Sequence, residues 1–145
     1  MTYADDERVR DARARYFADN GFSEAGNNAR WVVIALGPLA IVFPNTRARR
    51  RALRLHDLHH VATDYPTSFI GELEISAWEI GAGCGKYLAA WYFSLAGAMT
   101  GLVVAPRRVL RAFARGRRSR TLYRDGWRDE LLDLTVGQLR AQLGL

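Results

Sequence analysis

The feature that most restricts the fold of this 145-residue chain is an uncharged stretch of nineteen residues, from Tyr87 to Ala105. Nineteen apolar residues can form a helix that crosses a bilayer, and Pro106 and the arginines that follow would give it a positive flank. We favour a second interpretation, a core helix rich in small residues in an all-helical domain. Gly97 and Gly101 suit close helix packing in either setting. In a third interpretation, the segment forms one apolar wall of a pocket for a hydrophobic ligand.

Several other segments carry helix signals. Asp5 to Asn20 has apolar residues at helical spacing and precedes Gly21, a typical C-cap. Asn45-Thr46 is a suitable N-cap for a helix over residues 47–63. Tyr65-Pro66-Thr67 ends that helix, and a second one is expected from Ser68 to about Gly81. The two helices would form a helical hairpin, and a short closing helix is expected near the C-terminus.

The segment "WVVIALGPLAIVFP", Trp31 to Pro44, is a second uncharged stretch. Gly37-Pro38 interrupts it, so it cannot cross a bilayer as one helix. We expect buried or interfacial apolar segments here, which together with residues 87–105 would shelter an apolar ligand.

Composition indicates one folded domain over residues 1–145, with an N-terminal helix within residues 1–21. Apolar residues make up 49% of the chain and charged residues 25%, which argues against disorder. Cys84 is the only cysteine, so the chain has no internal disulfide and suits a reducing compartment. The N-terminal segment has no apolar region typical of a secretory signal. We expect an all-α, single compact helical domain with a metal site on the helical hairpin and an apolar pocket, in the cytoplasm.

The net charge of +6 is concentrated in arginines at residues 47–54 and 107–120. Arg107, Arg111 and Arg115 follow one another at intervals of four and would form one stripe on an amphipathic helix. The stripe is either a patch for anionic lipid or phosphate, with the protein peripheral on the inner face of a bacterial membrane, or a solvated helix face. No aromatic–basic platform accompanies the charge, so we expect no nucleic-acid partner.

All three histidines lie within "HDLHH", residues 56–60. On a helix His56 and His60 are about 40° apart around the axis, and Asp57 lies within the same arc of about 100°. His59 falls outside this arc. The spacing therefore nominates His56, Asp57 and His60 as metal ligands.

Glu72, twelve residues after His60, would be brought back towards the first helix by the hairpin. Glu79 lies on the same helix face and is expected to support the ligands by hydrogen bonding, whereas Glu74 points away, solvated or paired with an arginine. Imidazoles with carboxylates suit one divalent ion, zinc first, with iron, manganese or cobalt as alternatives. The alternative interpretation of an HxxxH pair is ordinary exposed or core histidines.

The stretch also resembles a known family, the fourth Coq family of ubiquinone (coenzyme Q) biosynthesis proteins. Its hallmark is HDxxH, eleven residues and then Glu, which matches His56, Asp57, His60 and Glu72. The flanks "HHVATDYPT", "GELEISAWE" and "GRRSRTLYRDGW" are similar too, so the likeness covers residues 45–145.

The resemblance implies an all-helical fold and a divalent metal held by His56, Asp57, His60 and Glu72. It also implies oxidative decarboxylation of a prenylated ring, or a scaffold that organises other biosynthetic enzymes at a membrane. We therefore expect a metal-dependent decarboxylase or lyase acting on a quinone-like, prenylated aromatic or polyketide-type substrate. A non-catalytic lipid- or quinone-binding scaffold with a structural metal is the first alternative, and a metal-dependent hydrolase, suggested by the likeness of HDxxH to HExxH, is the second. Expected partners are a hydrophobic small molecule or lipid, biosynthetic enzymes and a second copy of the chain.

Overall fold

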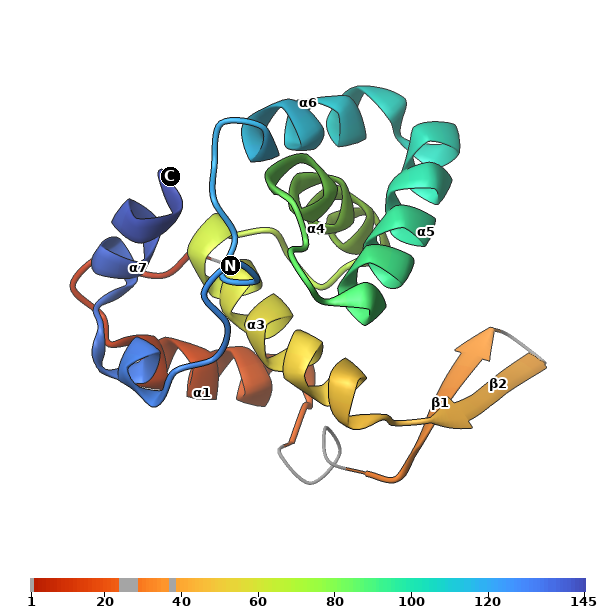
Figure 1. Ribbon diagram of the computed structural model, residues 1–145, viewed down its shortest axis with the longest axis horizontal. Helices are drawn as coiled ribbons and strands as arrows, with labels where there is room; N and C mark the ends of the chain where they lie inside the picture. Colours follow the sequence, from red (N-terminus) through yellow and green to blue (C-terminus); the bar gives the residue numbers. More distant parts are fainter. Residues whose placement is uncertain (1, 24–28, 37–38) are drawn as a thin grey trace.

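Helices make up most of the chain that the computed structural model describes, which is residues 2–23, 29–36 and 39–145, with only the backbone described at 32–36 and 39–43. Figure 1 shows the elements in chain order. They are α1 (Val9–Asn20), β1 (Trp31–Leu36), β2 (Leu39–Pro44), α3 (Arg47–Thr63), α4 (Phe69–Ala82), α5 (Leu88–Val104), α6 (Pro106–Gly116), the 3₁₀ helix η1 (Asp129–Asp133) and α7 (Val136–Leu143).

The helix caps agree with the sequence prediction. The Thr46 hydroxyl accepts a hydrogen bond from the Arg49 amide at the start of α3, and the Ser68 hydroxyl accepts one from the Gly71 amide at the start of α4. Thr135 and Gln138 form a reciprocal capping box at the start of α7. Helices α3 and α4, which carry the predicted ligands, therefore begin where their local sequence signals place them.

Helix α4 lies between α5 and α6 and packs closely against both (Figure 1). The contacts need small residues: a Cβ on Gly97 of α5 would lie 2.3 Å from the Ser76 hydroxyl, and one on Gly116 of α6 would lie 2.1 Å from the Trp78 carbonyl oxygen. Among the described residues, no helix combines the length and apolar character needed to cross a membrane. The buried residues of α5 are the small ones, Ala90, Ser94, Ala98 and Gly101, whereas its large apolar side chains are exposed, so only one side of α5 matches the expected core helix.

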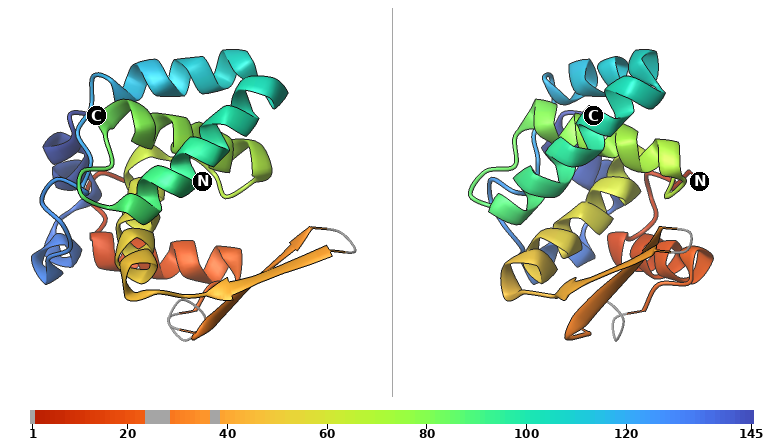
Figure 2. Two further views of the ribbon diagram at one scale, coloured as in Figure 1. Left: turned by 45° about the vertical axis from the view of Figure 1, so that its right-hand side comes forward. Right: turned by 90° about the vertical axis from the view of Figure 1, so that its right-hand side faces the viewer.

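The all-α expectation needs one correction at residues 31–44. Strands β1 and β2 pair in antiparallel register, with Val33 opposite Val42, and form a hairpin that extends away from the helices (Figures 1 and 2). Runs rich in β-branched valine and isoleucine on both sides of Gly37-Pro38 favour strands over helices. The predicted sheltering role of this segment concerns the side chains of residues 32–43, which lie outside the described residues.

Helices α1 and α7 pack on α3, on the side away from α5. Helix α1 begins at Val9 rather than at Asp5, because the preceding residues bond to the C-terminal region: the Val9 amide donates to the Leu134 carbonyl and the Val136 amide to the Glu7 carbonyl. This packing places Tyr16 of α1 against the ring of His60, with 5.5 Å between ring centroids.

Candidate metal centre

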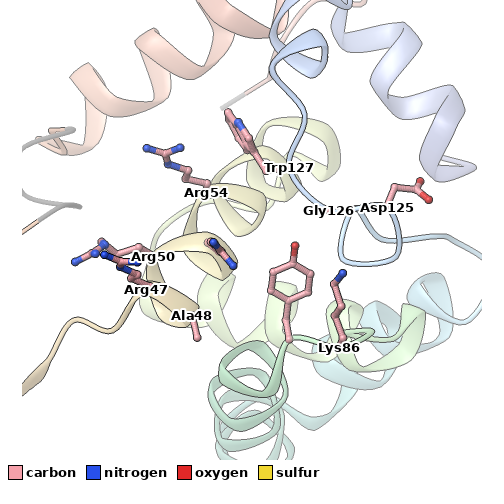
Figure 3. A pocket seen from close by; sticks show the side chains of 10 residues that line it. Arg47, Ala48, Arg50, Arg54, Lys86, Asp125, Gly126 and Trp127 are labelled. Carbon is pink, nitrogen blue, oxygen red and sulfur yellow. The ribbon is translucent and has the colours of Figure 1, made fainter.

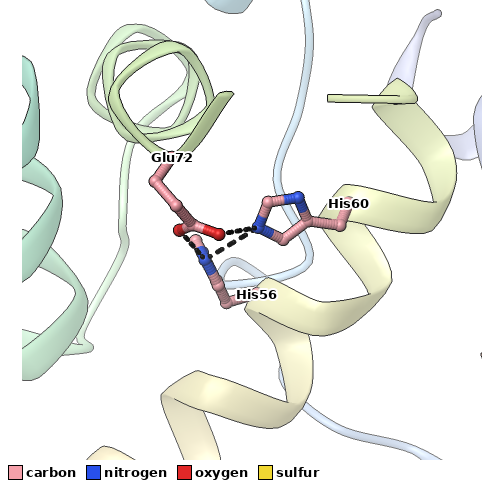
Figure 4. Close-up of side chains that lie close together, drawn as sticks. All are labelled: His56, His60 and Glu72. Atoms are coloured by element: carbon pink, nitrogen blue, oxygen red, sulfur yellow. Dashed lines mark hydrogen bonds and ion pairs between the residues drawn. The ribbon is translucent and has the colours of Figure 1, made fainter. Parts of the chain in front are cut away.

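His56 and His60 occupy successive turns of α3, and their Nε2 atoms lie 3.2 Å apart (Figure 4). The four-residue spacing puts both side chains on one face of the helix, as the sequence predicts. The His60 side chain is buried and the His56 side chain is 20% exposed. The pair therefore presents two ring nitrogens to one point, and of the two side chains only that of His56 is partly exposed to solvent.

Glu72, in the first turn of α4, faces the same point (Figure 4). Its two carboxylate oxygens lie 3.5 Å from His56 Nε2 and 3.3 Å from His60 Nε2. The chain reverses tightly before α4, and this reversal brings Glu72 towards the two histidines. The backbone packs so closely there that a Cβ on Gly71 would lie only 2.0 Å from the Pro66 carbonyl oxygen. Glycine at residue 71 thus lets the chain turn back so that Glu72 meets the histidines.

The second nitrogen of each ring is held by a hydrogen-bond acceptor. His56 Nδ1 lies 2.9 Å from Glu79 Oε1, and His60 Nδ1 lies 2.8 Å from the Tyr65 carbonyl oxygen. A carbonyl or carboxylate oxygen accepts a hydrogen bond from the Nδ1–H group, which leaves the lone pair of each neutral ring on Nε2. Both lone pairs are then aimed at each other and at the Glu72 carboxylate.

These three residues fit one metal ion. Ligand atoms at about 2.0–2.2 Å from a tetrahedral ion are separated from one another by about 3.3–3.6 Å. The two Nε2 atoms lie 3.2 Å apart, and a different Glu72 oxygen faces each of them, at 3.5 Å from His56 and 3.3 Å from His60. With one oxygen counted for Glu72, the three ligand atoms lie within 4.8 Å of one another. Two nitrogen lone pairs and a carboxylate repel one another unless a cation or a shared proton lies between them. The arrangement therefore suits a divalent ion with two imidazole ligands and one carboxylate ligand.

The charges of the metal-free protein reflect this repulsion. Burial by itself lowers the pKa of His56, but the Glu79 and Glu72 carboxylates outweigh it, so the pKa lies well above the usual histidine value. Burial raises the pKa of Glu72, but His56 and His60 outweigh it and hold the pKa well below its usual range. Without a metal ion, His56 therefore favours its protonated form beside the two carboxylates.

Glu79, predicted as a supporting residue, lies at the centre of a buried network. Its Oε1 accepts hydrogen bonds from His56 Nδ1, from His59 Nδ1 at 2.7 Å and from the Tyr123 hydroxyl at 2.9 Å, and its Oε2 accepts one from the Ser94 hydroxyl at 2.6 Å. Burial raises the pKa of Glu79, but His56 and His59 hold it well below its usual range. Glu79 is therefore a carboxylate whose position four donors determine.

His59, Tyr123 and Ser94 were not predicted as site residues. His59 lies outside the arc of His56 and His60, as its helical position requires, and its Nε2 accepts a hydrogen bond from the Leu122 amide at 3.0 Å. This bond fixes the proton on Nδ1, which donates to Glu79, and burial lowers the pKa of His59. No sequence signal could reveal this network, because tertiary packing brings its members together from four separate segments: α3, α4, α5 and the segment around Tyr123.

Asp57 is not part of the group that the structure brings together. The described residues place His56, His60 and Glu72 within 4.8 Å of one another, whereas the buried Asp57 carboxylate lies 3.9 Å from the guanidinium of Arg13 on α1. The reason is helical: Asp57 is about 100° around α3 from His56 and faces α1. Asp57 as a fourth ligand stays a prediction.

A pocket of about 250 Å³ adjoins the group. Its lining includes the polar residues His56, Glu72 and Glu79. Helix α5 adds apolar surface from Ala89, Ala90 and Phe93. Arg49 and Ser94 add polar groups, so the walls are mixed rather than uniformly apolar.

The three predicted surface arginines lie on α6. All three are exposed, and Arg115 also donates a hydrogen bond to the Thr63 carbonyl at the end of α3 and lies over the Tyr65 ring. Glu74, on α4, forms a bidentate ion pair with Arg108. Its two carboxylate oxygens accept from Arg108 Nε at 2.9 Å and from Nη2 at 2.7 Å. The stripe is therefore partly engaged in holding α6 against the rest of the protein.

The fold and the site together define a mostly helical protein with a candidate mononuclear metal centre made of two histidines and one carboxylate. Comparison with protein-family models, with curated proteins and with solved structures finds no match for the chain. The resemblance to the Coq family therefore stays a prediction that rests on the motif and its flanks.

Proposed function

We propose that this protein is a metal-dependent enzyme of quinone or natural-product biosynthesis that acts on a small aromatic ring. The observation that carries the proposal is the convergence of His56 Nε2, His60 Nε2 and the Glu72 carboxylate beside a pocket. A site with three protein ligands leaves a coordination position for water or substrate, which is the arrangement of catalytic rather than structural metal sites.

Zinc is the first candidate ion, and two histidines with one carboxylate equally suit iron(II) in oxygen-dependent chemistry. Manganese and cobalt accept the same donors. When bound, the ion would polarise a ring carboxylate or carbonyl, or support reaction with dioxygen. Oxidative decarboxylation, which replaces a ring carboxyl by a hydroxyl with dioxygen as oxidant, is the reaction that the motif's resemblance suggests.

The protein residues around the site have separable tasks. Glu79 and the Tyr65 carbonyl hold the histidine rings in the orientation that points Nε2 at the ion. Phe93 and the neighbouring alanines of α5 supply a flat apolar wall, and Arg49 places a cation at the pocket that suits a substrate carboxylate. The pocket chemistry therefore favours an aromatic acid over a neutral apolar chain.

Metal content tests the ligand assignment. Purified protein reconstituted with zinc or iron(II) should hold about one ion per chain, and Glu72→Gln should lose it. Glu74→Gln is the matched control, because Glu74 lies two residues away on the same helix and pairs with Arg108 instead. A Glu72→Gln variant that retains a full equivalent of metal would show that the site is assigned wrongly.

Substrate turnover tests the reaction. We expect the metal-loaded protein to release labelled carbon dioxide in air from a prenylated hydroxybenzoate labelled at its carboxyl carbon. His60→Ala, which removes one metal ligand, should abolish the release. Metal-loaded wild type that binds such an acid but never turns it over would instead favour a non-catalytic role.

That role, a lipid-binding scaffold, has its own supporting observation. The outer face of α5 exposes large apolar side chains, among them Tyr92 at 72%, Met99 at 61% and Val103 at 84% exposure, and Leu110 of α6 extends the patch. Contiguous exposed apolar surface marks interaction sites, and Arg107 and Arg111 lie nearby on α6. Sedimentation with anionic vesicles should be weakened by Met99→Glu with Val103→Glu if a membrane covers this face.

A further inference from the structure

A second and larger hollow lies along the first turns of α3, and none of the candidate metal ligands lines it (Figure 3). Its volume is about 790 Å³. We call it the basic cleft. Its walls come from residues 47–54 of α3, from Lys86 and Tyr87 before α5, and from residues 125–127 of the C-terminal region.

The basic cleft carries a large uncompensated positive charge. Five cationic side chains line it against the single carboxylate of Asp125, and these cations are Arg47, Arg50, Arg51, Arg54 and Lys86. Each ion pair found among the described residues involves other cations, such as Arg108 with Glu74 and Arg140 with Asp64. The cleft therefore concentrates positive charge that the fold leaves unneutralised.

This charge costs the fold stability. Arg47 and Arg51, and likewise Arg50 and Arg54, are like charges four residues apart on a helix, a spacing at which they repel each other. The first turn of α3 contains no acidic residue, so the arginines there also oppose the helix dipole. These arginines therefore destabilise α3 in two ways. Because folding does not benefit from their charge, the charge is better explained by a function.

The opposite wall of the cleft is held in place by its backbone and by Trp127. Gly126 has a φ of +80°, and a Cβ there would lie 3.0 Å from the Tyr87 hydroxyl. Trp127 donates a hydrogen bond from Nε1 to Asp129 at 2.8 Å, and the Arg54 guanidinium lies over its ring at 5.5 Å. The cleft is therefore a shaped site rather than a set of loose surface arginines.

We propose that the basic cleft binds the phosphate groups of a soluble di- or triphosphate. Arginine forks match phosphate oxygens in geometry and charge. A phosphate group carries a charge of about −1.5 to −2, so one group would neutralise only part of the cleft and two or three would balance it. Residues 47–54 extend for roughly 10 Å along α3, at about 1.5 Å a residue, which is long enough for several linked phosphates.

Calorimetric titration with inorganic pyrophosphate and inorganic phosphate tests the proposal. Wild type should bind pyrophosphate more tightly than phosphate at physiological salt. The double variant Arg47→Ala/Arg51→Ala should bind pyrophosphate at least tenfold more weakly. The control Arg107→Ala/Arg111→Ala removes the same charge from α6, outside the cleft, and should stay within about twofold of wild type.

Two further measurements separate this site from the metal centre and from a fold defect. Glu72→Gln should keep the wild-type affinity for pyrophosphate, because Glu72 does not line the basic cleft. Arg47→Ala/Arg51→Ala should be at least as stable as wild type to urea without ligand, because it relieves repulsion.

Equal losses in the cleft variant and the α6 control would overturn the proposal, since they would indicate general charge attraction. So would the absence of pyrophosphate binding at millimolar concentration. Binding of phosphorylated-lipid vesicles or of a short single-stranded RNA that depends on Arg47 and Arg51, with no competition from pyrophosphate, would also overturn it and would assign the cleft to that other ligand.

Discussion

The Glu79→Gln substitution is the most informative perturbation of the buried network. Glutamine has nearly the same shape as glutamate, so its carbonyl oxygen can take the place of Oε1 and still accept from His56, His59 and Tyr123. Its amide nitrogen would replace Oε2, and the Ser94 hydroxyl, which now donates to Oε2, can turn and accept. The substitution therefore removes the negative charge and leaves His56, His59 and Tyr123 with an acceptor.

The expected cost follows from the three bonds to Oε1. A hydrogen bond to a charged acceptor contributes about 1.5–3 kcal/mol and one to a neutral acceptor about 0.5–1.5 kcal/mol. The loss is about 1 kcal/mol for each of the bonds from His56, His59 and Tyr123, and so about 3 kcal/mol in all. Glu79→Ala would leave all these donors buried without acceptors, and we expect it not to fold stably.

Urea unfolding of metal-free protein, followed by circular dichroism, measures this loss. Glu74→Gln is the control on the same helix, and the loss of its ion pair with the half-exposed Arg108 should change stability little. A Glu79→Gln variant within about 0.5 kcal/mol of wild type would refute the account of the network, since such a change is typical of substitutions away from it.

The same variant gives a second, independent result. Because Glu79 orients His56 through Nδ1, the affinity for zinc should fall about 10–100-fold, the range typical of residues that support metal ligands. Competition with a chelating dye measures this affinity directly. Unchanged zinc affinity combined with lost stability would mean that Glu79 serves the fold and not the metal.

Three other substitutions or treatments test the packing. Burial raises the pKa of the Cys84 thiol to about 12, so at pH 8 we expect almost no thiolate and no reaction with a disulfide reagent until the protein unfolds; rapid reaction of folded protein would contradict its placement. Gly116→Ala should lower the free energy of unfolding by about 1–3 kcal/mol, because the new methyl group would lie 2.1 Å from the Trp78 carbonyl oxygen, and an unchanged urea midpoint would place α6 wrongly. Arg140→Lys should cost about 2 kcal/mol, since lysine cannot reach the Ala62 and Tyr3 carbonyls and the Asp64 carboxylate together, and the same urea titration measures it.

Local signals predict the helices of this chain well. Thr46 and Ser68 cap α3 and α4 because a short hydroxyl side chain satisfies a backbone amide within its own turn, with no help from distant residues. Gly21 ends α1 in the left-handed conformation for an equally local reason. The start of α1 is different, because Val9 bonds to Leu134, and a contact so distant in sequence leaves no local signal.

The β-hairpin is less clear from local signals. The lack of charge from Trp31 to Pro44 does not distinguish strands from buried helices. Its valines and isoleucines, on both sides of Gly37-Pro38, carry the strand preference that the structure bears out.

The sequence by itself determined that the candidate metal ligands on α3 converge. His56 and His60 converge because four residues are close to one helical turn, a relation that holds wherever the helix lies. Glu72 could also be predicted, since the break at Pro66 and the restart at Ser68 turn the chain back over a short distance.

Only the tertiary structure decided what surrounds those ligands. Asp57 faces Arg13 because α1 packs on that side of α3, and Glu79 gathers His59, Ser94 and Tyr123 because α5 and the C-terminal segment close over α4. The physical reason is the difference between local contacts and contacts between distant parts of the sequence. Helix geometry fixes neighbours within a turn or two, whereas the partners of a buried carboxylate depend on how whole elements pack.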